Sequence, residues 1–513
     1  MGVVVGISFS SQLKKLLGNS LNIEVFTWVI VLALPFFILG GFFPSLLGRI
    51  SQAGMTYLTS SWDWFYLGSC SFFVAACLLI ALSPLGRIRL GRDDEKPEYS
   101  FFSWFAMLFS AGMGIGLVFW ACSEPMYHLI KPPIGVPETP QTARRAFEIF
   151  YFHWGLHAWA TYVVVGLPMA YFSFRKGRPA VVSACLPGRL GRGGGATVID
   201  ILAIWATIMG VVTSLGMGAL QINKGLESAL GLPATAGHAA LIIAVITCLF
   251  IISALSGVSK GIKILSLLNV SLMVILLLFF FTCGPFTYIL RTFFQALGDY
   301  LKELLPLSTS LVLFDNPQWT RSWTVFYWAW WIAWAPFVGA FIAQISRGRT
   351  IREFILVVLV VPPLFSFIFS SALGGTAVWL DLFRHVELAG VVKKSIEAVL
   401  FATLKELPFY IGMVFFTNLL ISSFFITSAD SATYVITLYS TGGHPASEAG
   451  ARHRLIIFWG LMLGGLAIVL IYSGGLKALQ TASIVGAFPF IFVMYLLLVT
   501  VVRALIKDYR ENR

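Results

Sequence analysis

The sequence predicts an all-α polytopic membrane protein with twelve transmembrane helices, and three observations lead to this fold class. Of the 513 residues, 58% are hydrophobic and only 11% are charged, whereas a soluble globular domain carries about 25% charged residues. The charged residues stand mainly between long apolar runs. These runs reach the roughly 20 residues that a helix needs to cross the ~30 Å hydrocarbon core of a bilayer. The composition therefore excludes an ordinary soluble enzyme.

Each apolar run is expected to be a helix, because an open strand cannot satisfy its backbone hydrogen bonds in lipid. In chain order, the expected spans are 25–48, 64–86, 99–123, 149–174, 201–223, 237–259, 264–290, 322–346, 354–380, 407–429, 455–476 and 478–502. Two connections, 291–321 and 381–406, are long and mixed in character, so each could hold a helix lying along the membrane surface.

The charges orient the chain. With the N-terminus in the cytoplasm, most of the 35 Lys and Arg fall in inner loops, which favours a multi-pass protein of the cell membrane with both termini cytoplasmic. The net charge of +12 does not predict a nucleic-acid partner, because the basic residues do not gather on one domain face. The six cysteines show no C-x-x-C spacing, so neither a disulfide framework nor a zinc site is expected.

Two spans contain helix breakers in mid-membrane. The third span has three glycines at alternate positions, Gly112, Gly114 and Gly116, and the eighth has Pro336. Backbone freed in mid-membrane is tolerated where it lines a cavity, and paired interruptions are typical of a transporter site. Their separation by five spans fits two five-helix repeats. Alternatively, the glycines form a helix-packing face and Pro336 a simple kink.

We therefore expect a short cytoplasmic segment (1–24) and two peripheral helices (25–98), followed by the first repeat (99–290). An outer connection (291–321), the second repeat (322–502) and a short cytoplasmic tail (503–513) complete the chain.

Aromatic residues gather on two helix faces. At 100° per residue, one face on the eighth span covers about 100° and holds Tyr327, Trp330, Trp331 and Trp334. A second face, on the fourth span, covers about 140° and holds Trp154, Trp159 and Tyr162. Such faces can form a cage for a quaternary ammonium group, which ring quadrupoles attract at roughly 0.5 to 2 kcal/mol each. An interfacial aromatic belt is the alternative, but Trp330 and Trp334 lie well inside their span.

These motifs resemble the betaine/choline/carnitine transporter family. The matching stretches are FYWAWWIAWAPFVGAFIAQISRGRTIREF at 326–354, GMGIGLVFW at 112–120 with Glu124 and Pro125 after it, and ITSADSA at 426–432. The resemblance implies a LeuT-like fold of two inverted five-helix repeats preceded by two extra helices. It also implies a homotrimer in membrane lipid that works by alternating access.

The resemblance also assigns substrate-binding residues. It implies that Trp330, Trp331 and Trp334 hold the ammonium group, with Phe326 and Trp328 nearby and with Trp154, Trp159 and Tyr162 completing the aromatic environment. The stretch with Gly112, Met113, Gly114 and Gly116 would approach the other end of the substrate. Asp430 is expected to orient or cap within this site, and Glu124 to serve structure or gating.

Sodium is the coupling ion that the resemblance implies. Gly116 stands where proton-coupled choline carriers have an Asp, and carnitine exchangers have an arginine-containing stretch there. One sodium site would use the carbonyls of Ser110, Met113 and Phe424 with the hydroxyls of Thr427 and Ser428. Alternatively, these two hydroxyls bond to the carbonyl four residues back. A second site would use Thr207 and the region of Phe337, but Val211 stands where a second threonine is expected.

The sequence as a whole predicts a sodium-coupled symporter for a quaternary-ammonium solute, with glycine betaine as first choice and no cofactor beyond the ion. Choline, carnitine, the sulfonium compound dimethylsulfoniopropionate and ectoine are alternatives, as are proton coupling and exchange. An enzyme is not expected, because the G-x-S-x-G match at 257–261 joins two membrane helices rather than a strand and a helix. A channel would show a carbonyl filter or a charged ring. His153 and His157 are expected to pack rather than to bind metal.

Overall fold

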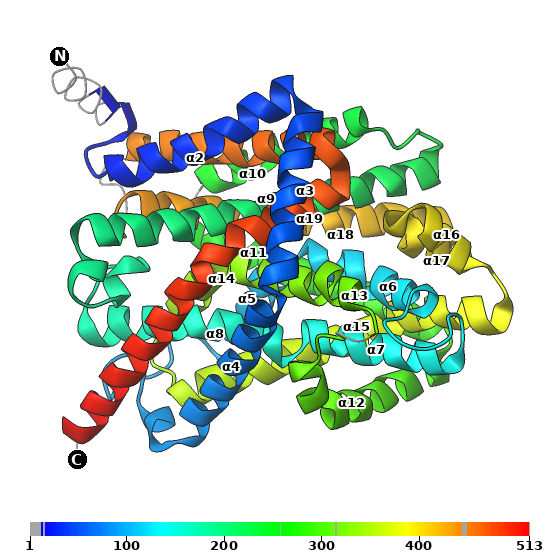
Figure 1. Ribbon diagram of the computed structural model, residues 1–513, viewed down its shortest axis with the longest axis horizontal. Coiled ribbons are helices and arrows are strands. Elements are labelled where there is room, and N and C mark those ends of the chain that lie inside the picture. The colour runs from blue at the N-terminus through cyan, green and yellow to red at the C-terminus, as the bar shows by residue number, and fades with distance from the viewer. Residues whose placement is uncertain (1–11, 14–15, 257, 313–314, 444–448, 512–513) are drawn as a thin grey trace.

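The computed structural model describes residues 12–13, 16–256, 258–312, 315–443 and 449–511, and it is mostly helical over these ranges (Figure 1). The first half contains α2 (Ile23–Phe42), α3 (Pro44–Ser61), α4 (Asp63–Leu82), α5 (Phe101–Gly112), α6 (Ile115–Ile130), α7 (Pro140–Trp154), α8 (Leu156–Ala170), α9 (Gly193–Leu230) and α10 (Ala236–Ser256). The second half contains α11 (Val258–Cys283), α12 (Phe286–Thr309), α13 (Pro317–Ser322), α14 (Thr324–Gln344), α15 (Ile351–Arg384), α16 (Leu388–Lys394), α17 (Val399–Lys405), α18 (Tyr410–Ser440) and α19 (Ala449–Glu511).

Among the described residues, nine helical segments are long and apolar enough to cross a membrane. The third expected span is divided between α5 and α6, and the fourth between α7 and α8. The last two expected spans are joined in α19, which has non-helical backbone angles at Gly474 and Gly475. An all-helical polytopic protein is therefore shown, whereas the count of twelve spans and the inverted repeats stay predictions. Gly257, in the G-x-S-x-G match, lies outside the described residues.

Local sequence explains where several helices begin and end. Asn22 accepts a hydrogen bond from the Val25 N–H at the start of α2, and Thr350 caps α15 in the same way through the Glu353 N–H. Such side-chain oxygens satisfy backbone donors that have no partner inside the helix. At the other end of α9, Gly231 adopts a left-handed conformation with φ of 70°, which glycine adopts without strain.

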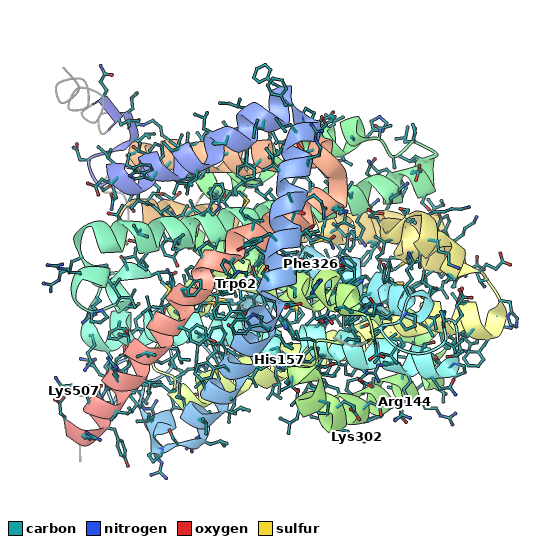
Figure 2. The ribbon with its side chains drawn as sticks, viewed as in Figure 1. Trp62, Arg144, His157, Lys302, Phe326 and Lys507 are labelled. Atoms are coloured by element: carbon teal, nitrogen blue, oxygen red, sulfur yellow. The ribbon has the colours of Figure 1, made fainter. Side chains whose placement is uncertain are left out.

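α14 lies at the centre of the molecule. Nearly all of its residues are buried, and it packs against α8, α9 and α19. Figure 2 shows Phe326 of this helix near the middle of the view, whereas Arg144, Lys302 and Lys507 lie toward its edges. In Figure 1, α2 begins and α19 ends on the left, opposite α16 and α17 on the right. The helices α12, α16 and α17 occupy much of the two long connections, where helices were expected.

The expected interruption of the eighth span at Pro336 is wrong, because α14 runs unbroken from Thr324 to Gln344. Proline removes one backbone donor, and membrane helices tolerate it where neighbouring groups satisfy the freed backbone. The carbonyl that Pro336 leaves without its helical donor is that of Ile332, four residues earlier. The carbonyl of Pro336 itself accepts a hydrogen bond from the Tyr439 hydroxyl of α18 at 2.7 Å. Packing on all sides, rather than a broken backbone, therefore accompanies this proline.

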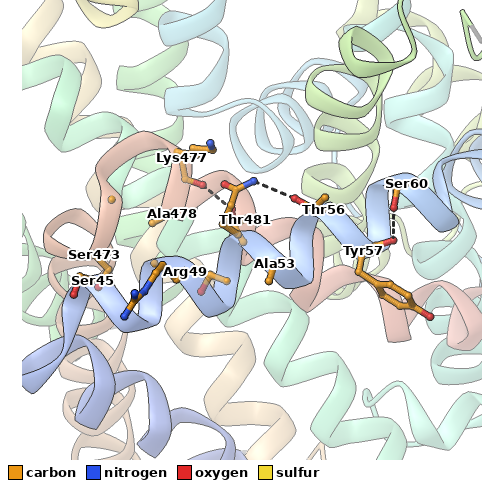
Figure 3. Close-up of a pocket in the computed structure, with 14 residues that line it drawn as sticks. Ser45, Arg49, Ala53, Thr56, Tyr57, Ser60, Ser473, Lys477, Ala478 and Thr481 are labelled. Atoms are coloured by element: carbon orange, nitrogen blue, oxygen red, sulfur yellow. Dashed lines mark hydrogen bonds between the residues drawn. The ribbon is translucent and has the colours of Figure 1, made fainter.

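α3 is an element that the sequence did not predict. It fills the connection between the first two expected spans, and a groove of about 760 Å³ separates it from α19 near the Gly474 kink (Figure 3). Arg49 on α3 and Lys477 on α19 contribute the cationic side chains of this groove, among mainly hydroxyl-bearing and small neighbours.

Candidate substrate cage

The third span is broken at its glycines. α5 ends at Gly112 and α6 begins at Ile115, and between them Met113 and Gly114 have extended backbone angles, with ψ of 110° and −139°. A helix start leaves backbone N–H groups without helical partners and carries a partial positive charge. The predicted interruption is therefore present here, and it places the N-terminus of α6 in the interior, since the first turn of α6 is buried.

A small cavity lies against this break. It is lined by the glycines Gly112, Gly114 and Gly116, by Leu117, and by the aromatic residues Trp154, Tyr162, Trp330, Trp331 and Trp334. We call these five aromatic residues the cage. The cavity volume is about 10 Å³, which is about the space that one water molecule needs. The cage is therefore closed in this conformation.

The rings of the cage meet at steep angles. Trp154 stands perpendicular to Trp331, with ring centroids 5.0 Å apart, and Tyr162 meets Trp331 at 5.7 Å and 74°. Trp330 stacks on Phe326 at 5.7 Å and 12°. Edge-to-face and offset-stacked pairs are the favourable arrangements for aromatic rings. Two faces that belong to the fourth and eighth spans thus meet in one packed group.

Glycine is required where the rings press on the broken helix. A Cβ atom at Gly116 would lie 2.2 Å from Cη2 of Trp330, and one at Gly112 would lie 2.5 Å from Cη2 of Trp159. Real Cβ atoms do not approach ring carbons this closely. The alternating glycines therefore let the aromatic rings pack directly against the backbone of the third span.

Other predicted substrate residues lie outside the cavity lining. Phe326 is stacked behind Trp330, Trp159 lies against Tyr162 with centroids 5.4 Å apart, and Trp328 stacks on His157 at 5.2 Å. The sulfur of Met113 accepts a hydrogen bond from Ser366. Asp430 on α18 accepts one from the Ser253 hydroxyl at 2.7 Å, so it does not line the cage.

The polar atoms of the cage fall into two groups. Trp330 Nε1 donates to Ser214 Oγ at 3.2 Å, and Trp331 Nε1 donates to the His153 carbonyl at 3.0 Å. The Tyr162 hydroxyl and Trp334 Nε1 are buried and find no hydrogen-bond partner among the described residues. Unpaired buried donors cost free energy unless a ligand or water satisfies them.

Glu124 lies behind the cage, where the sequence had suggested only a structural or gating role. Its Oε2 accepts from Trp154 Nε1 at 3.0 Å and from the Tyr327 hydroxyl, and its Oε1 lies 2.7 Å from His153 Nδ1. His153, expected only to pack, is therefore part of a polar network. A carboxylate inside an apolar span was the available signal, but its hydrogen-bond partners lie on other helices, His153 and Trp154 on α7 and Tyr327 on α14.

Ser428, one of the predicted sodium residues on α18, lies beside the broken helix. Ser428 Oγ is 3.0 Å from the place that a Gly114 Cβ would occupy, and it has no partner in the described part of the chain. Thr427 donates to the Ser423 carbonyl four residues back at 2.8 Å, as the alternative predicted, and accepts from Asn269 at 2.9 Å. Phe424 is buried. The side chain of Ser110 lies outside what the structure describes.

The residues of the doubtful second sodium site are buried in apolar surroundings. The Thr207 hydroxyl donates to the Ala203 carbonyl four residues back at 2.8 Å. Phe337 packs against Trp334, with centroids 5.7 Å apart. Val211, one turn after Thr207, is buried and supplies no side-chain oxygen. Sodium prefers oxygen ligands, so the second site stays a prediction without its usual hydroxyl.

The chain is similar to known proteins over nearly its whole length. Residues 24–510 match the betaine/carnitine/choline family of transporters. The chain is 44% identical to the glycine betaine transporter OpuD of Bacillus subtilis, over 95% of both chains. It is 40% identical to the ectoine/hydroxyectoine transporter of Virgibacillus pantothenticus, over 96% of this chain and 98% of the relative. It is 36% identical to the betaine/ectoine transporter LcoP of Corynebacterium glutamicum, over 99% of this chain and 81% of the relative.

Both the family match and these relatives extend over nearly the whole chain, from the first long helix to the end of α19. Family members are transporters and not enzymes. With its many apolar helices, this protein is a multi-pass membrane protein of the betaine/carnitine/choline transporter family.

Proposed function

We propose that this protein is a sodium-coupled symporter that imports glycine betaine by alternating access. The observation that carries the proposal is the cage, in which five aromatic side chains from two helical regions surround one small cavity beside a broken helix. A trimethylammonium group has no hydrogen to donate, so ring faces suit it better than hydrogen-bond acceptors do.

The same cavity offers donors for the carboxylate of a zwitterion. The Tyr162 hydroxyl and Trp334 Nε1 have no partner among the described residues, and the N-terminus of α6 begins beside the glycines of the lining. Helix N-termini and free N–H groups attract carboxylates. Donors and rings in one small space favour a short zwitterion such as glycine betaine, in which cation and anion are close together.

Other onium solutes satisfy these groups less completely. Choline has no carboxylate and would leave the donors of Tyr162 and Trp334 unpaired, at a cost in affinity. Carnitine is longer. Dimethylsulfoniopropionate carries both charges and is the nearest competitor. Ectoine is a second candidate because two of the relatives are ectoine transporters, but its ring N–H groups require acceptors, and the Tyr162 oxygen is the side-chain acceptor in the lining.

Sodium coupling rests on the unpaired Ser428 hydroxyl beside the break at Gly114. An ion bound there would contact α18 and the unwound backbone together, which is how transporter sites hold sodium. One positive charge moving inward with a zwitterion gains about 2.3 kcal/mol per 100 mV of membrane potential. A single sodium ion would therefore support accumulation of the solute.

The cage must open for substrate, because its cavity of about 10 Å³ holds no more than one water. In the proposed cycle, substrate and ion bind from outside, one repeat rocks against the other around the cage, and both leave inside. The trimethylammonium group would separate the rings of Trp154 and Trp331, and the carboxylate would pair with the Tyr162 hydroxyl.

A binding screen with purified protein tests the proposal. Tryptophan fluorescence is titrated with glycine betaine, choline, carnitine, dimethylsulfoniopropionate and ectoine, in sodium chloride and in potassium chloride. We expect the tightest binding for glycine betaine, and only with sodium. Equal binding in potassium would refute sodium coupling, and tighter ectoine binding would select the second candidate. In proteoliposomes, exchange of labelled for unlabelled substrate separates a carrier from a channel.

A further inference from the structure

We propose that Glu124 is the positioning residue of the cage and the source of its selectivity for a cationic headgroup. Its buried carboxylate holds the rings of Trp154 and Tyr327 and places a negative charge directly behind the cage. The inference rests on the proposed function, since it assumes that an onium group enters the cage. It adds a residue outside the cavity lining to the set that recognises the substrate.

The carboxylate of Glu124 is surrounded by donors. Oε2 accepts hydrogen bonds from Trp154 Nε1 and the Tyr327 hydroxyl. Oε1 accepts one from His153 Nδ1 at 2.7 Å and lies 3.4 Å from His128 Nε2. Glu124 and both histidines have no exposed surface. A buried carboxylate is stable only when such partners satisfy it, and three hydrogen-bond donors favour its charged form.

Neighbouring groups place the protons of both histidines. Trp319 Nε1, which can only donate, lies 3.4 Å from His128 Nδ1, so the His128 proton is on Nε2, which lies 3.4 Å from Glu124 Oε1 without a hydrogen bond among the described residues. His153 Nε2 lies 3.0 Å from the Thr324 hydroxyl, which can donate to it while His153 Nδ1 carries the proton. His153 therefore donates its Nδ1–H to Glu124, and His128 carries its proton on the nitrogen nearer to the same carboxylate.

The same proton placement argues against a metal ion at this cluster. One ligand atom each from Glu124, His128 and His153 lies within 4.8 Å of the others, a spacing that a transition metal could bridge. However, a ligating imidazole nitrogen must be unprotonated. With Nδ1 of His128 engaged by Trp319, Nε2 keeps its proton. A hydrogen-bonded carboxylate therefore explains the cluster better than an ion does.

The hydrogen bonds of Glu124 connect its carboxylate to both walls of the cage, one formed by α7 and the other by α14. Trp154, which Glu124 holds, stands perpendicular to Trp331. Trp331 in turn donates to the His153 carbonyl, and the His153 ring stacks on Tyr327 at 4.5 Å and 20°. The walls formed by α7 and α14 are thus both fixed to a carboxylate on α6. Fixing the rings in advance reduces the entropy that substrate binding would otherwise lose.

The negative charge acts on the substrate through Trp154. A carboxylate at the indole N–H polarises the ring, because hydrogen-bonded groups in a low-dielectric interior strengthen one another. The ring face toward the cavity then attracts a cation more strongly. Water does not screen the charge, since the whole group is buried. We therefore expect Glu124 to favour trimethylammonium over a tert-butyl group of the same shape.

Two substitutions of Glu124 separate its effect on the ring positions from the effect of its negative charge. In Glu124→Gln, the amide oxygen can accept from Trp154 and Tyr327 while the amide nitrogen donates to His153, whose proton moves to the nitrogen facing Thr324. The rings stay in place and the charge is lost. In Glu124→Asp, the charge remains but the shorter side chain cannot reach the rings. Asp200→Asn is the matched control, because Asp200 is a buried carboxylate that accepts from Ser183 and lies outside the cage lining.

The measurement is competition against labelled glycine betaine by unlabelled glycine betaine and by tert-butylacetate, its isostere without a cation. We expect Glu124→Gln to weaken glycine betaine by about ten-fold but tert-butylacetate much less, so that the ratio of the two affinities falls. We expect Glu124→Asp to weaken both ligands and to keep their ratio. Asp200→Asn, the control, should match the wild type in its affinity for both ligands.

An unchanged ratio in Glu124→Gln would overturn the charge assignment, because a merely structural role weakens both ligands equally. Unchanged glycine betaine affinity in Glu124→Asp would overturn the positioning assignment, and this variant decides if the glutamine protein does not purify as a single species. Failure of the proposed function is distinct, since the wild-type protein would then bind no onium compound at all.

Discussion

Trp331 contacts three other rings of the cage, and no single pattern in the sequence predicted all of these contacts. Its ring meets Trp154, Tyr162 and Trp330, and its N–H is fixed by a backbone carbonyl. The ring positions rest on contacts between residues far apart in the chain, such as Trp154 and Trp331. At the residue scale, the proposed recognition of the substrate therefore depends on rings that are held in place before it binds.

Replacing Trp331 by Leu should abolish uptake of trimethylammonium substrates at low concentration. One ring face contributes up to about 2 kcal/mol to cation binding, which corresponds to roughly thirty-fold in affinity. The measurement is uptake of labelled glycine betaine with protein level checked in the membrane. Trp28→Leu, at an exposed tryptophan of α2, is the matched control, and unchanged affinity in Trp331→Leu would remove the cage from the proposal.

Replacing Ser428 by Ala should raise the sodium concentration for half-maximal transport by about ten-fold, because one ion ligand is lost. Thr427→Ala should raise it less, since the Thr427 hydroxyl already bonds to Ser423 and Asn269. Thr433→Ala, five residues after Ser428 on α18 and with its hydroxyl bonded to the Ala429 carbonyl, should match the wild type. Transport is measured against external sodium, and an equal response of all three variants would contradict the site.

At the element scale, two broken helices and one unbroken helix build the site. The break at Met113 and Gly114 follows from alternating glycines that the sequence displays. The break between α7 and α8 at Gly155 was not predicted. There the freed Leu156 N–H donates to the Tyr300 hydroxyl of α12 at 3.1 Å. A single glycine gives no sign of a partner so distant in the chain, so this break could not be read from the sequence.

Gly116→Ala should weaken glycine betaine binding by about ten-fold or more, because the added methyl overlaps Trp330 and must displace a ring of the cage. The ring cannot turn away freely, since it is stacked on Phe326 and bonded to Ser214. Binding is followed by tryptophan fluorescence. Gly375→Ala in α15, where nothing lies within 4 Å of the added atom, is the control and should keep wild-type affinity.

The attachment of α12 to α7 should depend on pH. Asp299 accepts hydrogen bonds from Arg144 and Gln295, and the bond from the Arg144 guanidinium holds the pKa of this carboxyl below its ordinary value. The ion pair therefore stabilises the fold above the ordinary carboxyl pKa, and its contribution is lost as the pH falls through the lowered pKa. Because Arg144 is largely exposed, the contribution is about 0.5 kcal/mol.

Asp299→Asn should accordingly lower the thermal unfolding temperature slightly near neutral pH, and this difference from the wild type should shrink toward zero in strong acid. Unfolding is followed in detergent by scanning fluorimetry over a pH series. Glu303→Gln, on the same helix and paired with Lys302 at its surface, is the control. A difference that grows as the pH falls would contradict the assigned direction of the pKa shift.

At the scale of the whole molecule, the sequence predicted more of the fold than of the polar site. Apolar runs long enough to span a membrane are visible in the local sequence. They predict membrane helices without any knowledge of how the helices pack. The network around Glu124 unites α6, α7 and α14, and such pairing depends on the packing of distant segments. For the same reason, the contacts around Pro336, such as the hydrogen bond from Tyr439 on α18, could not be predicted from the sequence.

The chain should assemble as a homotrimer, as the resemblance to the transporter family implies. Light scattering in detergent should give a protein mass of three times the 56.5 kDa of one chain. Native mass spectrometry provides an independent count of the subunits. A single chain at all concentrations tested would contradict the trimer, without affecting the cage, because the cage is complete within one chain.

The closed cage has a consequence for the permeability barrier of the cell. A carrier that imports a solute must return empty, and a wide wet passage at that moment would let ions and protons run down their gradients. Here the cavity of the cage has a volume of about 10 Å³, about the space of one water, and its rings pack against one another. In the proposed cycle, the empty carrier would therefore return while packed indole rings block the passage, and the ion gradients across the membrane would be kept.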